Sequence, residues 1–234
     1  MIVGIHQPNY LPWLGYFRKI AACDLFVFCD NAQMSGSQTY VSRNEIKSRD
    51  GRYWLTIPTK NKGDFNFIHQ TLVADQAWVR KHVRTLEINY SKAGCLDVLA
   101  EVIAPVLLRG HERIADLNIA LIRAIAQVLG LNSVKFVRAT ELPLQSTGAE
   151  SIPEILQVVG ATTYMSGTGG GAKRYLNVDS LRSMGINTAF VSTVFEPYPQ
   201  LYGKFEPNLS VVDALLNVGP ERARKLLTAT GDSV

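Results

Sequence analysis

The N-terminal segment contains the pattern that most restricts the fold: an apolar run, a helical segment and a second apolar run. Residues 1–5 form a short apolar run that ends at a proline-containing turn, which is typical of a buried strand. Residues 13–22 carry apolar side chains at helical spacing, namely Trp13, Phe17, Ile20 and Ala21. Residues 25–29 form the second apolar run. Two strands joined by a helix pair in parallel with a right-handed crossover, so this segment predicts a βαβ unit.

The rest of the chain predicts an α/β fold, a mostly parallel sheet flanked by helices. Apolar spacing and glycine stops predict a helical insertion or subdomain at about residues 76–130, in the middle of the chain. Strands and helices alternate again after it. We therefore expect one α/β domain over residues 1–227, followed by a flexible tail over 228–234. Outside residues 76–130 we expect strands at 52–57, 134–138, 163–166 and 188–192, and helices at 151–159, 176–184, 211–217 and 221–227.

Composition narrows the class of protein. Hydrophobic residues make up 47% and charged residues 19% of the 234 residues, which predicts a folded chain. The apolar stretches are too short to cross a membrane and the N-terminus has no basic leader, so we expect a cytoplasmic protein without membrane insertion. Its three cysteines are odd in number and lack metal-type spacing, so we expect neither a disulfide framework nor a zinc site, and we assign no metal ligand. The net charge of +4 is dispersed, which makes nucleic acid an unlikely partner and favours a phosphorylated small molecule.

The loop after the first strand is the leading candidate for a site. Pro8 and Pro12 fix its backbone, and a rigid loop suits a preorganised site. His6 lies at the end of a strand beside a helix N-terminus, where an imidazole acts as a general base or orients a phosphate. The alternative is a stiff turn whose aromatic residues cap the core. The candidate substrate-binding residues of this loop are Gln7, Asn9, Tyr10 and Trp13.

A second candidate group follows the second strand. Asp30 stands at a common catalytic or ribose-binding position, although an aspartate there is also an ordinary turn residue. Further along, Arg43 and Lys47 would share one face of a helix and suit a diphosphate, the alternative being solvated surface charges. We expect Asp30 to assist His6 in catalysis. The candidate substrate-binding residues here are Gln33, Arg43, Asn44 and Lys47.

A glycine-rich loop follows the strand at residues 163–166. Its glycines allow close approach of a ligand to the backbone, and a lysine adds positive charge. The Walker spacing is absent, because Ala172 and Arg174 occupy positions that would need glycine and serine or threonine. A mobile surface loop is the alternative. The candidate substrate-binding residues are Ser166, Gly167, Gly169 and Lys173.

These motifs also resemble a known family. The blocks Gln7-Pro8-x-Tyr10-Leu11-Pro12-Trp13-Leu14-Gly15-Tyr16-Phe17 and Arg43-Asn44-x-Ile46-Lys47 are similar to the WbqC-like protein family, and the similarity continues through Tyr198-Pro199-Gln200-Leu201-Tyr202-Gly203. The resemblance implies work on nucleotide-activated sugars in O-antigen or other surface-polysaccharide biosynthesis. Residues 34–40 and the loop after Gly167 depart from the family pattern, which leaves the substrate open. A weaker similarity, strand then Gln7-Pro8 then a helix opened by Leu14-Gly15, is to nucleotidylyltransferases.

We therefore favour an enzyme, a transferase that acts on a nucleotide-activated (amino)sugar or a related phosphorylated small molecule, including acyl or aminoacyl transfer. His6 would be the base, with Asp30 orienting it, and Arg43, Lys47 and Lys173 would hold phosphates. One alternative is an ATP-dependent nucleotidyl transferase or ligase, and another is a non-catalytic binding protein of a glycan pathway. The sequence assigns no cofactor, and it is compatible with a homo-oligomer.

Overall fold

A computed structural model describes residues 1–34, 39–60, 66–168 and 177–228 of the chain. The expected tail lies outside the described residues beyond Thr228, and so do the candidate residues Gly169 and Lys173.

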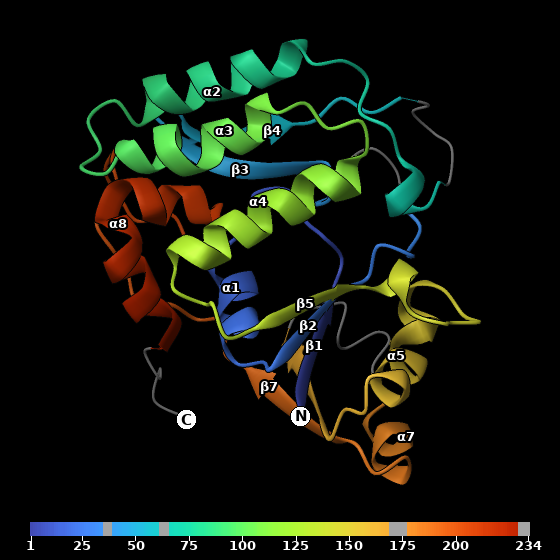
Figure 1. Ribbon diagram of the computed structural model, residues 1–234. Coiled ribbons are helices and arrows are strands. Elements are labelled where there is room, and N and C mark those ends of the chain that lie inside the picture. The colour runs from blue at the N-terminus through green and yellow to red at the C-terminus, as the bar shows by residue number, and fades with distance from the viewer. Residues whose placement is uncertain (35–38, 61–65, 169–176, 229–234) are drawn as a thin grey trace.

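The centre of the fold is a parallel sheet of five strands, which confirms the predicted α/β class. The N-terminal βαβ unit is also confirmed, because β1 pairs in parallel with β2 from Val3 opposite Leu25 to His6 opposite Phe28. Across the sheet the strand order is β5-β2-β1-β6-β7, so β1 is central (Figure 1). The strands are β1 (Ile2–His6), β2 (Leu25–Phe28), β5 (Lys135–Arg138), β6 (Thr163–Gly167) and β7 (Asn187–Val191).

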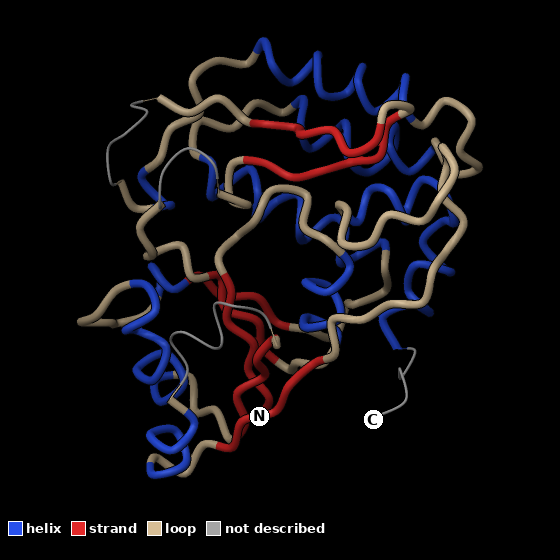
Figure 2. The backbone as a smooth tube through the Cα atoms, turned by 180° about the vertical axis from the view of Figure 1, so that it is seen from behind, coloured by secondary structure: helices blue, strands red, loops and turns tan. Residues whose placement is uncertain are grey.

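Helices cover both faces of this sheet. α1 (Leu14–Ala21) and α8 (Val211–Thr228) lie on one side, whereas α5 (Ile152–Val158) and α7 (Val178–Ser183) lie on the other (Figures 1 and 2). α8 bends at Gly219, whose φ of 79° is followed by a proline without a donor N–H. The two closing helices that the sequence predicts are therefore the two halves of α8.

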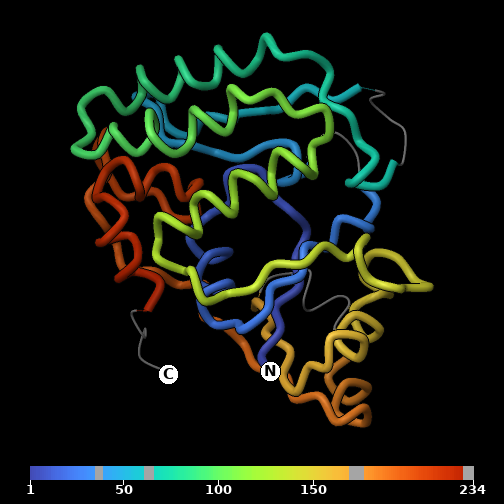
Figure 3. The backbone as a smooth tube through the Cα atoms, viewed as in Figure 1, coloured from blue at the N-terminus to red at the C-terminus, as the bar shows by residue number. Residues whose placement is uncertain are grey.

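The middle of the chain forms the upper part of the molecule in Figure 1. It contains the predicted helical block, α2 (Ala77–Asn89), the π-helix η2 (Leu99–Ile103) that runs into α3 (Ala104–Leu108), and α4 (Ile114–Val128). An antiparallel hairpin of β3 (Arg43–Ser48) and β4 (Gly51–Thr56) lies beside these helices (Figure 3). Short 3-10 helices η1 (Ile68–Gln70), η3 (Ala139–Glu141) and η4 (Gly148–Ser151) complete the connections. None of the described helices is both long enough and apolar enough to span a bilayer.

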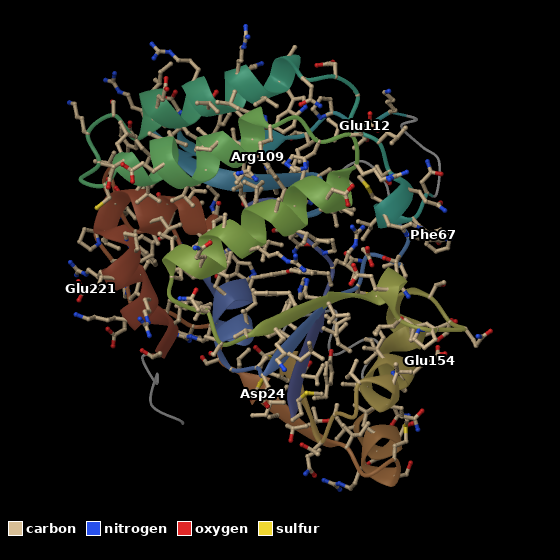
Figure 4. All side chains as sticks on the ribbon, in the orientation of Figure 1. Asp24, Phe67, Arg109, Glu112, Glu154 and Glu221 are labelled. Carbon is tan, nitrogen blue, oxygen red and sulfur yellow. The ribbon has the colours of Figure 1, made fainter. Side chains whose placement is uncertain are left out.

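The strand order fixes where a ligand can approach the sheet. The chain leaves β1 toward β2 on one side and leaves β6 toward β7 on the other, so the order reverses between β1 and β6. In open parallel sheets, the crevice for a ligand opens at such a reversal, beyond the carboxyl ends of the strands. Asp24, labelled in Figure 4, marks the opposite end, where its carboxylate accepts a hydrogen bond from the Ile2 N–H at 2.7 Å.

Candidate functional site

A cavity of about 460 Å³ opens at the carboxyl ends of β1 and β6, where the strand order reverses. We call it the switch-point pocket. Its volume lies within the range of about 300–1,000 Å³ that small-molecule sites occupy. Its walls come from β1, the first turns of α1, the ends of β6 and β7, and the start of α5. Polar side chains in the described lining include those of His6, Gln7, Tyr16, Lys19, Tyr164, Ser166 and Thr193.

The loop between β1 and α1 is held from outside by buried side chains. Asn118 donates a hydrogen bond to the Pro8 carbonyl at 2.9 Å, while Asn44 and Ser210 each donate to the Leu11 carbonyl at 2.7 Å. Leu11 is fully buried and has a φ of 39°, a left-handed conformation that a leucine rarely adopts. Such a strained backbone persists only where its surroundings determine it, so the loop is rigid before any ligand binds. Asn44 therefore holds the loop by direct hydrogen bonds, but it does not line the pocket.

Tyr10 anchors the same loop and points away from the pocket. It is fully buried, its hydroxyl lies 2.9 Å from Nδ1 of His82, and its ring meets Trp78 edge-on. Burial of His82 lowers its pKa to about 4, so the imidazole is neutral and Tyr10 has an uncharged partner. Asn9 is also buried and does not line the pocket.

His6 is the histidine of the switch-point pocket. Its Nδ1 lies 3.0 Å from the Gln7 carbonyl, which accepts only a hydrogen bond, so Nδ1 carries the proton and Nε2 keeps its lone pair. Burial, and then the charge of Lys19, lowers the pKa of His6 to about 4. The ring is therefore neutral at neutral pH. It offers a hydrogen-bond acceptor that becomes a stronger base once an anion binds nearby and raises its pKa.

Lys19 is the one lysine or arginine among the described residues that line the pocket, and it was not among the candidate residues predicted from the sequence. The side chain is buried, with Nζ 2.7 Å from the Ile5 carbonyl and 5.5 Å from the centroid of the Tyr164 ring. Burial lowers its pKa to about 8, which leaves the ammonium largely protonated at neutral pH. Among the described residues, no carboxylate lies within salt-bridge distance of Lys19 and none lines the pocket. Burial also raises the pKa of the Cys29 thiol on the pocket wall to about 12, so that thiol is neutral.

Trp13 and Gly15 form the entrance to α1. A Cβ atom at Gly15 would lie 2.4 Å from Cη2 of Trp13, so the indole packs directly over the glycine. Trp13 is the N-cap residue and its side chain caps no first-turn N–H. Tyr16, in that first turn, donates from its hydroxyl to the Gln7 carbonyl at 3.0 Å. The start of α1, a favourable place for a negative charge, thus lies between the indole of Trp13 and the ring of His6.

The end of β6 forms another wall. Ser166 is buried and its hydroxyl donates to the Gly167 carbonyl at 3.2 Å, while Thr193 after β7 pairs with Thr168 at 3.2 Å between hydroxyl oxygens. The remaining wall is the start of α5, where Ile152 faces the pocket. Glu154, labelled in Figure 4, orders the preceding loop by accepting the backbone N–H of residue 145 at 2.7 Å.

Asp30 has a buried carboxylate that does not line the pocket. It accepts hydrogen bonds from Nε of Arg138 at 2.7 Å and from the Thr140 N–H and hydroxyl at 3.1 and 2.9 Å. Arg138 in turn donates from NH1 to Asp116 at 2.7 Å. The carboxylate therefore joins the end of β2 to the end of β5, and the structure does not bring it to His6.

Arg43 and Lys47 lie on strand β3, so the assumed helix is wrong. Residues four apart on a strand share a face but are separated by about 13 Å. The Arg43 guanidinium stacks on Trp54, 4.0 Å from the ring centroid, and Lys47 donates to the Gln200 side chain at 3.2 Å and to the Lys204 carbonyl. Neither faces the switch-point pocket, and Gln33 is exposed and also lies outside it.

Comparisons with known proteins identify the family. Residues 7–225 match the WbqC-like protein family, so the chain belongs to this family. It is 36% identical over 222 residues to the uncharacterized protein Rv1507c of Mycobacterium tuberculosis, and the match covers 94% of each chain. No solved structure matches the chain.

Proposed function

We propose that the switch-point pocket binds a phosphorylated or nucleotide-linked small molecule, and that the protein is a transferase that acts on a nucleotide-activated (amino)sugar or a related phosphorylated compound. The observation that carries this proposal is Lys19, a buried cation that lines a cavity without a carboxylate among the described lining residues. A charge in that position attracts an anion strongly, because the surrounding protein screens it less than water would. A phosphate is the anion that the start of α1 also favours.

The chemistry follows from the neutral state of His6. A hydroxyl or amine of the acceptor attacks the transferred group, and its proton passes to Nε2 of His6. The bond from the transferred group to the leaving phosphate oxygen breaks, and the Lys19 ammonium stabilises the negative charge left on that oxygen. Binding of the anionic donor raises the pKa of His6 above its low value in the free protein, which strengthens the base when the donor is present. An acyl or aminoacyl group would move by the same proton path.

One further point supports the setting of this reaction. The family resemblance associates such proteins with O-antigen and other surface-polysaccharide biosynthesis, in which nucleotide-activated sugars are donors. These donors are cytoplasmic metabolites, so we place the protein in the cytoplasm.

The test is ligand-induced stabilisation of the full chain. Nucleoside diphosphates and nucleotide sugars are screened at millimolar concentration by thermal unfolding, with wild type, Lys19→Met and Lys135→Met. The matched control Lys135 is exposed on β5 and lies outside the pocket. We expect stabilisation of wild type and Lys135→Met and its loss in Lys19→Met. The proposal is wrong if no phosphorylated compound stabilises wild type, or if Lys19→Met responds like wild type.

A second candidate is an ATP-dependent nucleotidyl transferase or ligase. The favouring observation is the strand order, because a reversal beside β1 with a helix directly after it is where mononucleotide phosphates bind in α/β sheets. This candidate predicts release of pyrophosphate or ADP from ATP with magnesium when the acceptor is added, whereas the leading proposal predicts release of a nucleotide from a nucleotide sugar without ATP.

A further inference from the structure

A second cavity adjoins the switch-point pocket on the other side of Trp13. It has a volume of about 200 Å³, and we call it the aromatic pocket. Trp13 and Thr193 line both cavities. The aromatic pocket is formed between the start of α1 and the connection from β7 to α8, which passes α1 in Figure 2.

The described side chains that line the aromatic pocket are uncharged. Four aromatic side chains contribute to it, those of Trp13, Phe195, Tyr198 and Phe205. The Tyr198 and Phe205 rings meet edge-on with centroids 5.2 Å apart, and the Tyr198 hydroxyl already donates to Asp213 at 2.8 Å. Polar groups come from Thr193 and Asn208, and none of the described lining side chains carries a charge. This composition suits an uncharged occupant better than a phosphate.

The size of this cavity suits part of a ligand. Its volume is below the roughly 300 Å³ at which whole small-molecule sites begin, so it fits one ring of a larger molecule. Asn208, which lines it, has a φ of 60°, a left-handed conformation that asparagine adopts more readily than most residues. Its side-chain amide can both donate and accept hydrogen bonds.

We propose that the aromatic pocket binds the sugar ring of the nucleotide-activated sugar whose phosphates occupy the switch-point pocket. A pyranose ring has an apolar C–H face, which packs on aromatic rings, and a rim of hydroxyls, which need amide and hydroxyl partners. The uncharged aromatic lining with Asn208 and Thr193 provides both. The ligand passes around Trp13, so the bond between sugar and phosphate lies beside the start of α1. This inference rests on the proposed function and adds the place of the sugar.

The connection that forms the pocket is fixed in place by α1. Arg18 donates from NH1 to the Ser192 and Val194 carbonyls at 3.2 and 2.8 Å, and its guanidinium lies 3.8 Å from the centroid of the Phe195 ring. A backbone bridge also pairs Trp13 with Ser210. The connection that lines the aromatic pocket is therefore already ordered before the sugar binds.

The experiment compares each nucleotide sugar with its own nucleoside diphosphate by calorimetry: UDP-N-acetylglucosamine with UDP, GDP-mannose with GDP, dTDP-glucose with dTDP and ADP-glucose with ADP. The variants are Phe205→Leu and Asn208→Gly. Leucine keeps an apolar side chain without the ring, and glycine adopts the left-handed backbone of residue 208 without its amide. The matched control is Phe190→Leu, because Phe190 is exposed on β7 and lines neither pocket.

We expect at least one nucleotide sugar to bind wild type and Phe190→Leu about tenfold more tightly than its diphosphate, and Phe205→Leu and Asn208→Gly to reduce this ratio about threefold or more. Binding of the diphosphate alone should stay within about twofold, since the phosphates lie in the other pocket. If the diphosphate binds but the ratio is unchanged in both variants, or if both ligands weaken equally because a base occupies the cavity, the sugar assignment is wrong. If neither ligand class binds wild type, the proposed function fails as well.

Discussion

Replacing Asp30 with alanine removes the carboxylate that joins the ends of β2 and β5. The substitution breaks a charged hydrogen bond to Arg138 and two bonds to Thr140. Removal of one partner of a buried ion pair costs about 3–5 kcal/mol. The Arg138 side chain is 23% exposed and keeps its contact with Asp116, so we expect the lower end of this range, about 3 kcal/mol. Urea denaturation followed by circular dichroism measures this loss in the free energy of unfolding.

Asp116→Ala is the matched control, because it removes the other carboxylate that contacts Arg138. The Asp116 side chain is 38% exposed and lies in the first turn of α4, so its replacement should cost about 1 kcal/mol. A structural role for Asp30 is refuted if Asp30→Ala unfolds within about 1 kcal/mol of wild type. Equal losses of stability in the two variants would contradict the reasoning that the buried Asp30 carboxylate contributes more than the exposed Asp116 carboxylate.

Three further predictions concern the switch-point pocket and the loop between β1 and α1. Because the pKa of Lys19 is about 8, its charge is lost as pH rises through that value. A nucleoside diphosphate should therefore bind about tenfold more weakly at about pH 9 than at about pH 7. Calorimetry measures this decline, which should be absent in Lys19→Arg. Gly15→Ala must displace the Trp13 indole and should cost about 1–3 kcal/mol with altered near-UV dichroism, whereas Gly94→Ala, which meets no atom within 4 Å, should do neither. Asn44→Ala leaves the buried Tyr10 carbonyl without its side-chain donor, whereas the Leu11 carbonyl keeps Ser210. The substitution should lower the free energy of unfolding by about 2 kcal/mol, and an unchanged urea midpoint would contradict this.

Local patterns in the sequence were sufficient to predict the location of the pocket. Apolar runs and helical spacing identify the N-terminal βαβ unit, and parallel strands necessarily end at one edge of a sheet. His6 at the end of β1, Trp13 in the loop after it and Ser166 near the end of β6 therefore meet at the switch-point pocket. The meeting of these three residues follows from the parallel direction of β1 and β6, which the sequence pattern predicts.

The burial of Lys19 could not be predicted in the same way. Every residue of α1 from Leu14 to Ile20 is buried, because the sheet covers one side of the helix and α8 covers the other. Periodicity identifies a buried face only when the opposite face is exposed to water. One signal in the sequence could have identified Lys19 as a pocket residue. It follows Gly15 by one helical turn, so both lie on the same face of α1 as the loop after β1. The strand at Arg43 was missed for a similar reason, because a charged residue every four positions fits a helix face and a strand face alike.

The burial of Lys19 affects both the stability of the fold and the affinity of the pocket for an anion. Burying an ammonium costs free energy, and here its described contacts are the Ile5 carbonyl and the face of the Tyr164 ring. An apolar side chain of similar length would avoid that cost, so the lysine is best explained by what it binds. The same low polarity that lowers its pKa strengthens its attraction to an anion, and an anion bound there would raise that pKa again. On the proposed function, a phosphate would give Lys19 the charge partner that it lacks among the described residues, and the same buried environment that makes the free pocket costly would strengthen binding.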